Sequence, residues 1–225
     1  MVLNDKRIRI IVGHFGSGKS EFSINYAVKL SQVKKKVVLA DLDIVNLYFR
    51  SREKEEELKK LGIKVIGSSI KGLAADLPAI SSEIYGPIQD ESCDLVIDVG
   101  GDPNGARVLG MYSNYFTKDN YDMFFVLNGN RPETQTVKKS IEYLRKIENT
   151  ARIQVTGIVN NTHMLKSTTY KDVLKGQALA EKLSQELNIP IRYISVIEKV
   201  VKDLPDNLEG EIFPIKLYLR EEWMV

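Results

Sequence analysis

Eight consecutive residues near the start of the chain restrict its fold more than any other part of the sequence. Residues 13–20 read Gly-His-Phe-Gly-Ser-Gly-Lys-Ser, which fits the pattern G-x-x-x-x-G-K-[ST]. The apolar run Arg7–Val12 precedes them, and Glu21–Ser31 follows with apolar residues at helical spacing. A strand, a glycine-rich loop and a helix in this order predict a loop that binds phosphate groups.

Each residue type in this loop suits a triphosphate. The glycines let the backbone approach closely and direct N–H groups at phosphate oxygens, and the start of the helix adds partial positive charge. Lys19 is the point charge for the β- and γ-phosphates, and Ser20 supplies a hydroxyl for Mg²⁺. We expect a nucleotide to contact Gly13, His14, Phe15, Gly16, Ser17, Gly18, Lys19, Ser20 and Glu21.

Length, charge and cysteine content limit the remaining functions. The 225 residues suit one P-loop nucleotide-binding domain over residues 1–225. With 32 basic and 30 acidic residues, the charge gives no reason to expect nucleic acid as a ligand. The single Cys93 begins an apolar run, which favours a buried small side chain over a nucleophile. No signal-peptide pattern and no apolar stretch of about 18 residues is present, so we expect a cytoplasmic chain that does not bind membranes.

Short apolar runs alternate with helical segments along the chain. The expected strands are Val37–Ala40, Ile63–Ile66, Asp94–Ile97, Met123–Leu127, Gln154–Val159 and Ile191–Ile194. Helical stripes comprise Val137, Ile141 and Leu144, and then Leu179, Leu183 and Leu187. Unbroken apolar strands suit a mostly parallel sheet covered on both faces. The pattern predicts a doubly wound α/β fold with three αβα layers, which binds ligands at the carboxyl ends of its strands.

Three aspartates follow two of these strands. Asp41 and Asp43 come at the end of the second strand, and Asp98 follows the apolar strand Asp94–Ile97 in the Walker-B arrangement. Carboxylates at this edge can hold Mg²⁺ through water and orient an attacking water toward the γ-phosphate. Asp98-x-x-Gly101 also has the spacing at which a glycine N–H can sense the γ-phosphate. The alternatives are loop and helix-capping roles, with a helix beginning near Pro103.

Two amides at a later strand end indicate which base is bound. Asn160 and Asn161 stand where an amide can match the donor–acceptor edge of adenine. A guanine reader would use Asn-Lys-x-Asp, but His163 occupies the position of its aspartate. ATP is therefore favoured over GTP, although both asparagines also suit a turn.

These motifs, in this order, resemble the MinD/ParA/CobQ-like (SIMIBI-type) P-loop ATPases over roughly residues 7–200. That group includes partition ATPases, metal-centre maturation ATPases and amide ligases such as dethiobiotin synthetase. The resemblance implies that Lys19 and Ser20 hold phosphate and Mg²⁺, that Asp43 places the water, and that Asp41 and Asp98 surround the metal. It also implies that Asn160 reads adenine.

The chain departs from this family at one position. MinD/ParA-type loops carry a second lysine after the first glycine, which reaches the phosphates of the partner in an ATP-sandwiched homodimer. Here that position is His14, and a neutral imidazole supplies no fixed positive charge. Arg50 and Arg52, which follow the Asp-x-Asp segment, are candidates to supply this charge as an arginine finger. Their alternative partners are solvent and surface carboxylates.

Other segments carry weaker signals. The loop Asn128–Thr134, which contains Arg131, suits either a wall of the crevice or a turn with Pro132 near a helix start. Arg52–Lys60 predicts a solvated helix face, and the alternation of Ile215, Leu217 and Leu219 predicts a short packing strand. An isolated His163 is a poor metal ligand candidate.

The sequence therefore predicts a Mg²⁺-dependent ATPase that acts as a nucleotide switch for an unidentified partner protein, for example in maturation or activation of an enzyme. One alternative is an ATP-dependent small-molecule enzyme, either a kinase or a carboxylate-activating ligase. The other is an interaction module that binds nucleotide without hydrolysing it.

Overall fold

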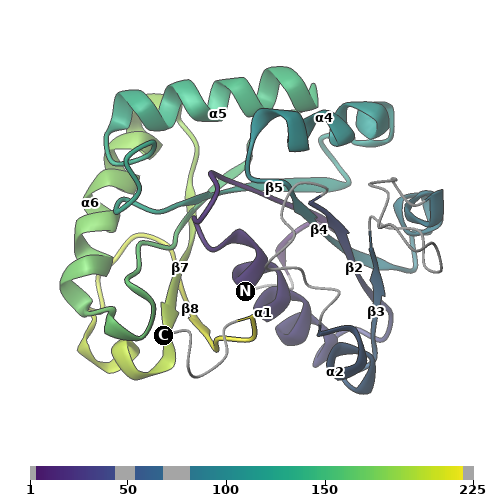
Figure 1. Cartoon of the computed structure of the whole chain (residues 1–225), viewed down its shortest axis with the longest axis horizontal. Coiled ribbons are helices and arrows are strands. Elements are labelled where there is room, and N and C mark those ends of the chain that lie inside the picture. Colours follow the sequence, from purple (N-terminus) through teal and green to yellow (C-terminus); the bar gives the residue numbers. More distant parts are fainter. Residues whose placement is uncertain (1–3, 44–53, 68–81, 220–225) are drawn as a thin grey trace, which may run out of the picture.

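Eight strands form one sheet in the computed structural model, which describes residues 4–43, 54–67 and 82–219 (Figure 1). All neighbouring strands are parallel, in the order β3-β2-β4-β1-β5-β6-β7-β8. The strands are β1 (Ile8–Val12), β2 (Val37–Leu42), β3 (Ile63–Ile66), β4 (Asp94–Val99), β5 (Tyr121–Leu127), β6 (Gly157–Asn160), β7 (Ile191–Ile197) and β8 (Glu211–Ile215).

The α-helices in these ranges are α1 (Lys19–Ser31), α2 (Glu55–Lys60), α3 (Tyr85–Gln89), α4 (Pro103–Tyr112), α5 (Val137–Ala151) and α6 (Tyr170–Leu187). Short 3₁₀ helices are η3 (Ser82–Ile84), η4 (Ser113–Tyr115), η5 (Leu165–Ser167) and η6 (Glu198–Asp203). Within the described ranges, no helix combines the length and apolar character that crossing a bilayer requires.

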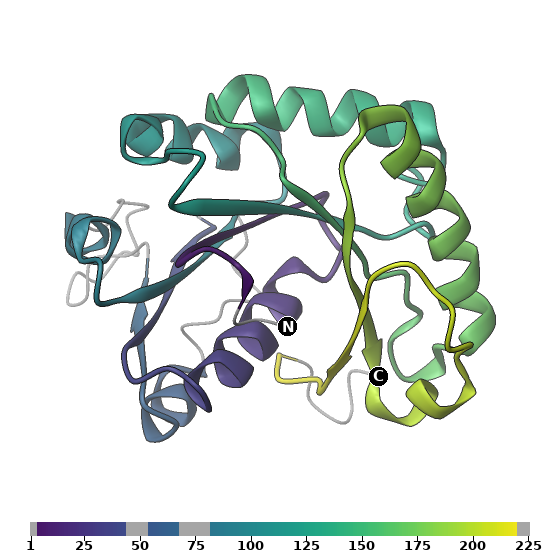
Figure 2. The ribbon, with the colours of Figure 1, turned by 180° about the vertical axis from the view of Figure 1, so that it is seen from behind.

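Helices cover both faces of the sheet (Figures 1 and 2). One face packs on α4, α5 and α6 through residues such as Leu109, Leu144 and Ala180. The other face packs on α1 and α2. Alternation along β1 explains this arrangement, because Ile10 faces the first core and Ile11 the second. The three-layer αβα fold expected from the sequence is confirmed.

The boundaries differ from the predicted ones in three places. β6 begins at Gly157, because the amide of Val155 bonds to Glu148 Oε1 (2.9 Å) instead of a neighbouring strand. Helix α5 begins at Val137, capped by Thr136 Oγ1, so Pro132 is not at a helix start. The last strand ends at Ile215, and the segment predicted to alternate beyond it is irregular.

Several smaller predictions are confirmed. Cys93 is buried, and burial raises the pKa of its thiol, as suits a small apolar residue. Leu58 is the buried residue of α2, while the other positions of that helix are half-buried or exposed. Arg50 and Arg52 lie outside the described residues.

Strand order places the glycine-rich loop centrally. The strands β2, β3 and β4 lie on one side of β1, and β5 to β8 lie on the other. The loop after β1 therefore opens where the order reverses, which is where doubly wound folds bind ligands. Because the strands are parallel, the carboxyl ends of β2, β4, β5 and β6 lie at this same edge.

Candidate nucleotide-binding site

The loop between β1 and α1 has the shape that an anion requires. Gly18 caps α1 with φ of 84°, in the left-handed region, and a Cβ there would lie 2.3 Å from Asn161 Nδ2. Only glycine fits this position. No side chain caps α1, so the N–H groups of its first turn are oriented toward the loop as anion donors.

Lys19 and Ser20 begin this helix and are both buried. Lys19 Nζ lies 3.9 Å from Asp43 Oδ2, in the loop after β2. The loop after β4 lies against the same ammonium group, because a Cβ on Gly101 would be 2.9 Å from Lys19 Nζ. The structure thus joins the glycine-rich loop, the Asp-x-Asp segment and the Asp-x-x-Gly segment at one cation.

Asp41, Asp43 and Asp98 form a buried cluster of carboxylates beside that cation. Asp41 and Asp98 are directly opposite each other on β2 and β4, and Asp41 Oδ1 accepts a 3.0 Å bond from the amide of Asp43. The hydroxyl groups of Ser20 and Ser23 donate hydrogen bonds to the carboxylate of Asp98. The bond from Ser23 Oγ to Asp98 Oδ1 measures 3.2 Å. The α4 start is capped by Asp102 (2.7 Å from Gly105 N), so the capping role considered for Asp98 belongs to Asp102.

The cluster raises the pKa of Asp98 to about 7. Burial is the main cause and the charge of Asp41 adds to it, whereas Lys19 and the hydroxyl of Ser20 oppose it. Among the described residues, no group of three or more His, Cys, Asp or Glu side chains could hold a metal ion. A hydroxyl and two carboxylates beside an anion-binding loop nevertheless fit Mg²⁺ that takes its other ligands from phosphate and water.

We predict that Asp98→Asn raises the thermal midpoint of the ligand-free protein at pH 8. Because the folded-state pKa lies above the ordinary value of 3.8, the native state holds the extra proton and loses stability as pH rises between these two values. We expect a gain of at least roughly 2–4 °C, which about 1 kcal/mol produces in a domain of this size. The difference in thermal midpoint between Asp98→Asn and wild type should become smaller as pH falls toward 4. Equal midpoints at pH 8 in calorimetric scans would contradict the charge cluster.

The two strand-end asparagines have different environments. Asn160 is fully buried, and its Nδ2 donates to Val173 O (3.0 Å) and Gln177 Oε1 (3.2 Å), so its amide is committed to α6. Asn161 Nδ2 donates to Ser17 O (2.7 Å), within the glycine-rich loop. Its buried Oδ1 has no hydrogen-bond partner in the structure. The adenine contact expected of Asn160 therefore fits Asn161 better.

The loop after β5 lies over the glycine-rich loop. Arg131 Nε donates to Gly16 O at 2.9 Å, and Asn128 Nδ2 approaches the same oxygen at 3.5 Å. Arg131 lines the same pocket as Lys19. Of the two interpretations of this loop, the structure supports the one in which it forms a wall of the crevice.

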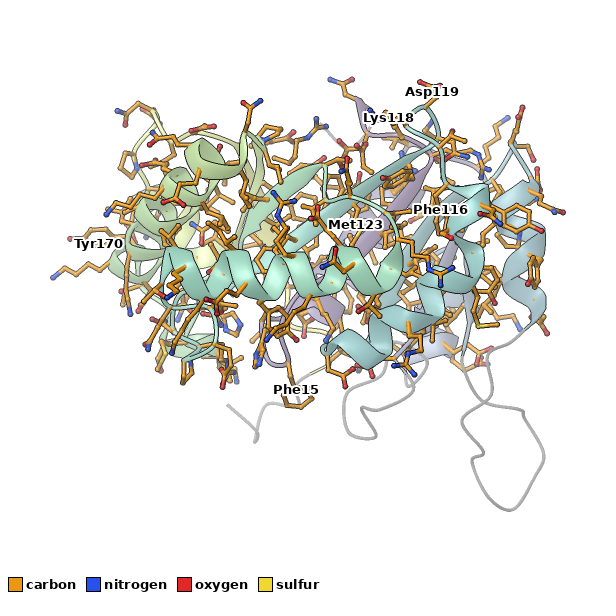
Figure 3. All side chains as sticks on the ribbon, turned by 90° about the horizontal axis from the view of Figure 1, so that it is seen from above. Phe15, Phe116, Lys118, Asp119, Met123 and Tyr170 are labelled. Atoms are coloured by element: carbon orange, nitrogen blue, oxygen red, sulfur yellow. The ribbon has the colours of Figure 1, made fainter. Side chains whose placement is uncertain are left out.

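The pocket extends from Lys19 and Ser20 to an apolar end. That end is lined by Leu165, Ile197, Ile215, Leu217 and Leu219, with Asn161 and His163 on one side. Phe15 also lines it, yet its side chain is 56% exposed and projects from the edge opposite to Lys118 and Asp119 (Figure 3). A polar end followed by an apolar end suits a phosphorylated molecule with a planar ring.

His14 is held within its own chain. Its Nδ1 lies 2.7 Å from Phe15 O, its Nε2 lies 3.8 Å from Glu133 Oε2, and its ring packs edge-on against Tyr143 at 4.9 Å. The position of the family's second lysine thus carries an imidazole that contacts the loop after β5 and helix α5.

Sequence reasoning missed Asn25 and assigned Glu21 a different partner. Both side chains bond to the backbone of residues 216–219, which lie about 190 positions later. Polar residues at i and i+4 on the buried side of a helix were the available signal.

Comparison with solved structures shows the same fold elsewhere. FtsY from Mycoplasma mycoides has a TM-score of 0.58 at 20% identity over 92% of this chain and 63% of that one. The cell division protein FtsY from Thermotoga maritima gives 0.54 at 23% identity, covering 86% and 62%. The signal recognition particle receptor FtsY from Elizabethkingia anophelis, in complex with GDP, gives 0.50 at 17%, covering 86% and 58%. This chain therefore spans about three fifths of the length of those proteins.

The fold and the glycine-rich loop define a nucleotide-binding P-loop domain. The family model described as the CobQ/CobB/MinD/ParA nucleotide binding domain matches residues 9–205. The chain belongs to this family. No curated protein matches the sequence.

Proposed function

We propose that this protein is a Mg²⁺-dependent ATPase whose nucleotide state controls an interaction with a partner protein. The observation that carries this proposal is the buried contact of Lys19 with Asp43 and Gly101, beside Asp41 and Asp98. Loops from three strands meet there, so gain or loss of a γ-phosphate would be felt by all three. Maturation or activation of an enzyme is one use of such a switch.

The residues have separate roles in the proposed hydrolysis. Lys19 and the first-turn amides of α1 neutralise phosphate charge, and Asp43 orients the attacking water. Ser20 and Asp98 would hold Mg²⁺, with Asp41 next to them, and the ion would neutralise charge on the β- and γ-phosphates. Arg131, bonded to Gly16 O, supplies a fixed cation in the same chain. The cluster is buried, and the exclusion of water strengthens the electrostatic interactions that these groups make with the phosphates.

We predict a preference for ATP over GTP. The bond from Asn161 Nδ2 to Ser17 O leaves Oδ1 as the acceptor of this amide, and Oδ1 has no hydrogen-bond partner in the structure. An acceptor matches the amino group of adenine and opposes the carbonyl oxygen of guanine. Competition of the two nucleotides for a fluorescent analogue tests this, with Asn161→Ala expected to reduce the discrimination. A clear preference for GTP would overturn the assignment.

We also predict that ATP alone drives homodimer formation weakly or not at all. His14 supplies no fixed cation and is held by Glu133 and Tyr143 of its own chain. Sedimentation with Mg²⁺ and a non-hydrolysable ATP analogue measures the effect. His14→Lys should raise the dimer fraction or the basal rate. A tight wild-type dimer that forms only with the analogue would contradict the prediction and restore the partition-type mechanism.

A further inference from the structure

The segment Lys216–Leu219, which follows β8, is held against α1 by two side chains. Asn25 acts on one end of it: its Nδ2 donates to Lys216 O at 2.8 Å, and its Oδ1 accepts from Lys216 N at 2.8 Å. Glu21 acts on the other end, where its carboxylate accepts from the amides of Tyr218 and Leu219, the latter at 3.2 Å. The two side chains thus bond to three of the four residues in this segment.

These contacts are buried and specific. Glu21 is 9% exposed and Asn25 is 8% exposed, and they stand at i and i+4 on one side of α1. A buried carboxylate costs free energy unless hydrogen bonds satisfy it, and backbone amides do so here. Because Lys19 and Ser20 begin the same helix, the segment is fixed relative to the phosphate-binding residues.

The other side of the segment forms the apolar end of the pocket. Leu217 and Leu219 line it together with Ile197 and Ile215, and Asn161 lines the same pocket. Neither leucine lies in a strand, so no sheet hydrogen bonds hold them in place. Their positions depend on the bonds that Glu21 and Asn25 make to the backbone around them.

We propose that Glu21 and Asn25 are positioning residues that hold Lys216–Leu219 as the wall on which the base of a bound nucleotide packs. This inference rests on the proposed function, because it places a nucleoside triphosphate in the pocket. In this proposal the carboxylate of Glu21 binds the backbone amides of Tyr218 and Leu219. Its role is to couple the base-binding end of the pocket to the helix that binds the phosphates.

Two ligands separate a base-positioning role from a general structural one. Calorimetric titrations with Mg²⁺ would compare ATP with inorganic tripolyphosphate, which has the phosphates but no base. For Glu21→Gln and Asn25→Ala, we expect ATP affinity to fall by about tenfold or more, equivalent to roughly 1.4 kcal/mol. Tripolyphosphate affinity should stay within about twofold of wild type, since the loop itself is unchanged. Gln32→Ala, an exposed change at the end of the same helix, is the matched control.

The wall itself provides a second variant, in case the polar substitutions impair folding. Leu217→Ala leaves Glu21 and Asn25 in place and removes part of the apolar surface of the pocket. It should therefore weaken the binding of ATP and leave the binding of tripolyphosphate unchanged. Unchanged ATP affinity in all three variants, or equal losses for both ligands, would overturn the inference. Wild-type protein that binds tripolyphosphate but not ATP would refute the proposed ATPase, and this inference with it. A wild type that binds neither ligand would instead refute the proposed function.

Discussion

Asp43→Asn is expected to lower the rate of ATP hydrolysis by about a hundredfold or more while ATP still binds, a loss in the range of general-base positions. Asparagine keeps the size and polarity of the side chain but can neither carry the charge nor accept a proton. Asp43 lies 3.9 Å from Lys19 Nζ and is buried at the edge where the γ-phosphate would sit. Phosphate release measured at saturating ATP gives the rate, and a titration gives the affinity.

The matched control is Asp119→Asn. Asp119 is exposed and lies at the opposite edge of the molecule from Phe15, as Figure 3 shows, so the same chemical change there should leave hydrolysis unaltered. A wild-type rate in Asp43→Asn would show that the Asp-x-Asp segment does not position the water. If the prediction holds, the ATP-loaded variant is a suitable bait for the partner.

Lys19→Ala should reduce ATP affinity at least about tenfold, or roughly 1.4 kcal/mol. The substitution removes the one cationic side chain of residues 13–20 at neutral pH and leaves the nearby carboxylates to repel the phosphates. Titration calorimetry of both proteins measures the loss, with thermal unfolding to establish that the variant is folded. Lys118→Ala, exposed at the opposite edge, is the control (Figure 3). Equal affinities for Lys19→Ala and wild type would remove this loop from the binding site.

Patterns that are local in sequence predicted the fold. The strands of the centre of the sheet are buried on both faces, so each reads as a mainly apolar run with one or two charged residues. Parallel strands share one carboxyl edge, which is why the sequence predicts Asp43 and Asp98 beside the glycine-rich loop. Boundaries were less predictable, since the start of β6 depends on the bond that the amide of Val155 donates to Glu148, seven residues earlier.

The features that depend on contacts between distant segments could not be predicted. Asn160 is the last residue of β6 and Asn161 follows it, so two chemically identical side chains stand side by side at the strand end. Which one meets α6 depends on the position of Val173 and Gln177. The i and i+4 spacing of Glu21 and Asn25 marks two polar residues on one side of a helix, but it does not reveal that their partners are residues 216–219. The base-binding end of the pocket is therefore the part that required the structure.

A single-turnover assay tests the central proposal most directly. Wild-type protein in excess over γ-labelled ATP, with and without Mg²⁺, reports hydrolysis even when the steady-state rate is low. We predict that Mg²⁺ converts the bound ATP to ADP with release of one free phosphate per ATP, that chelation of Mg²⁺ stops the reaction, and that no acceptor is required. ATP that stays intact with Mg²⁺ would identify a binding module. Label that stays on an added small molecule would identify a kinase, and phosphate release that requires an added small molecule would identify a ligase; each of these results would contradict the switch.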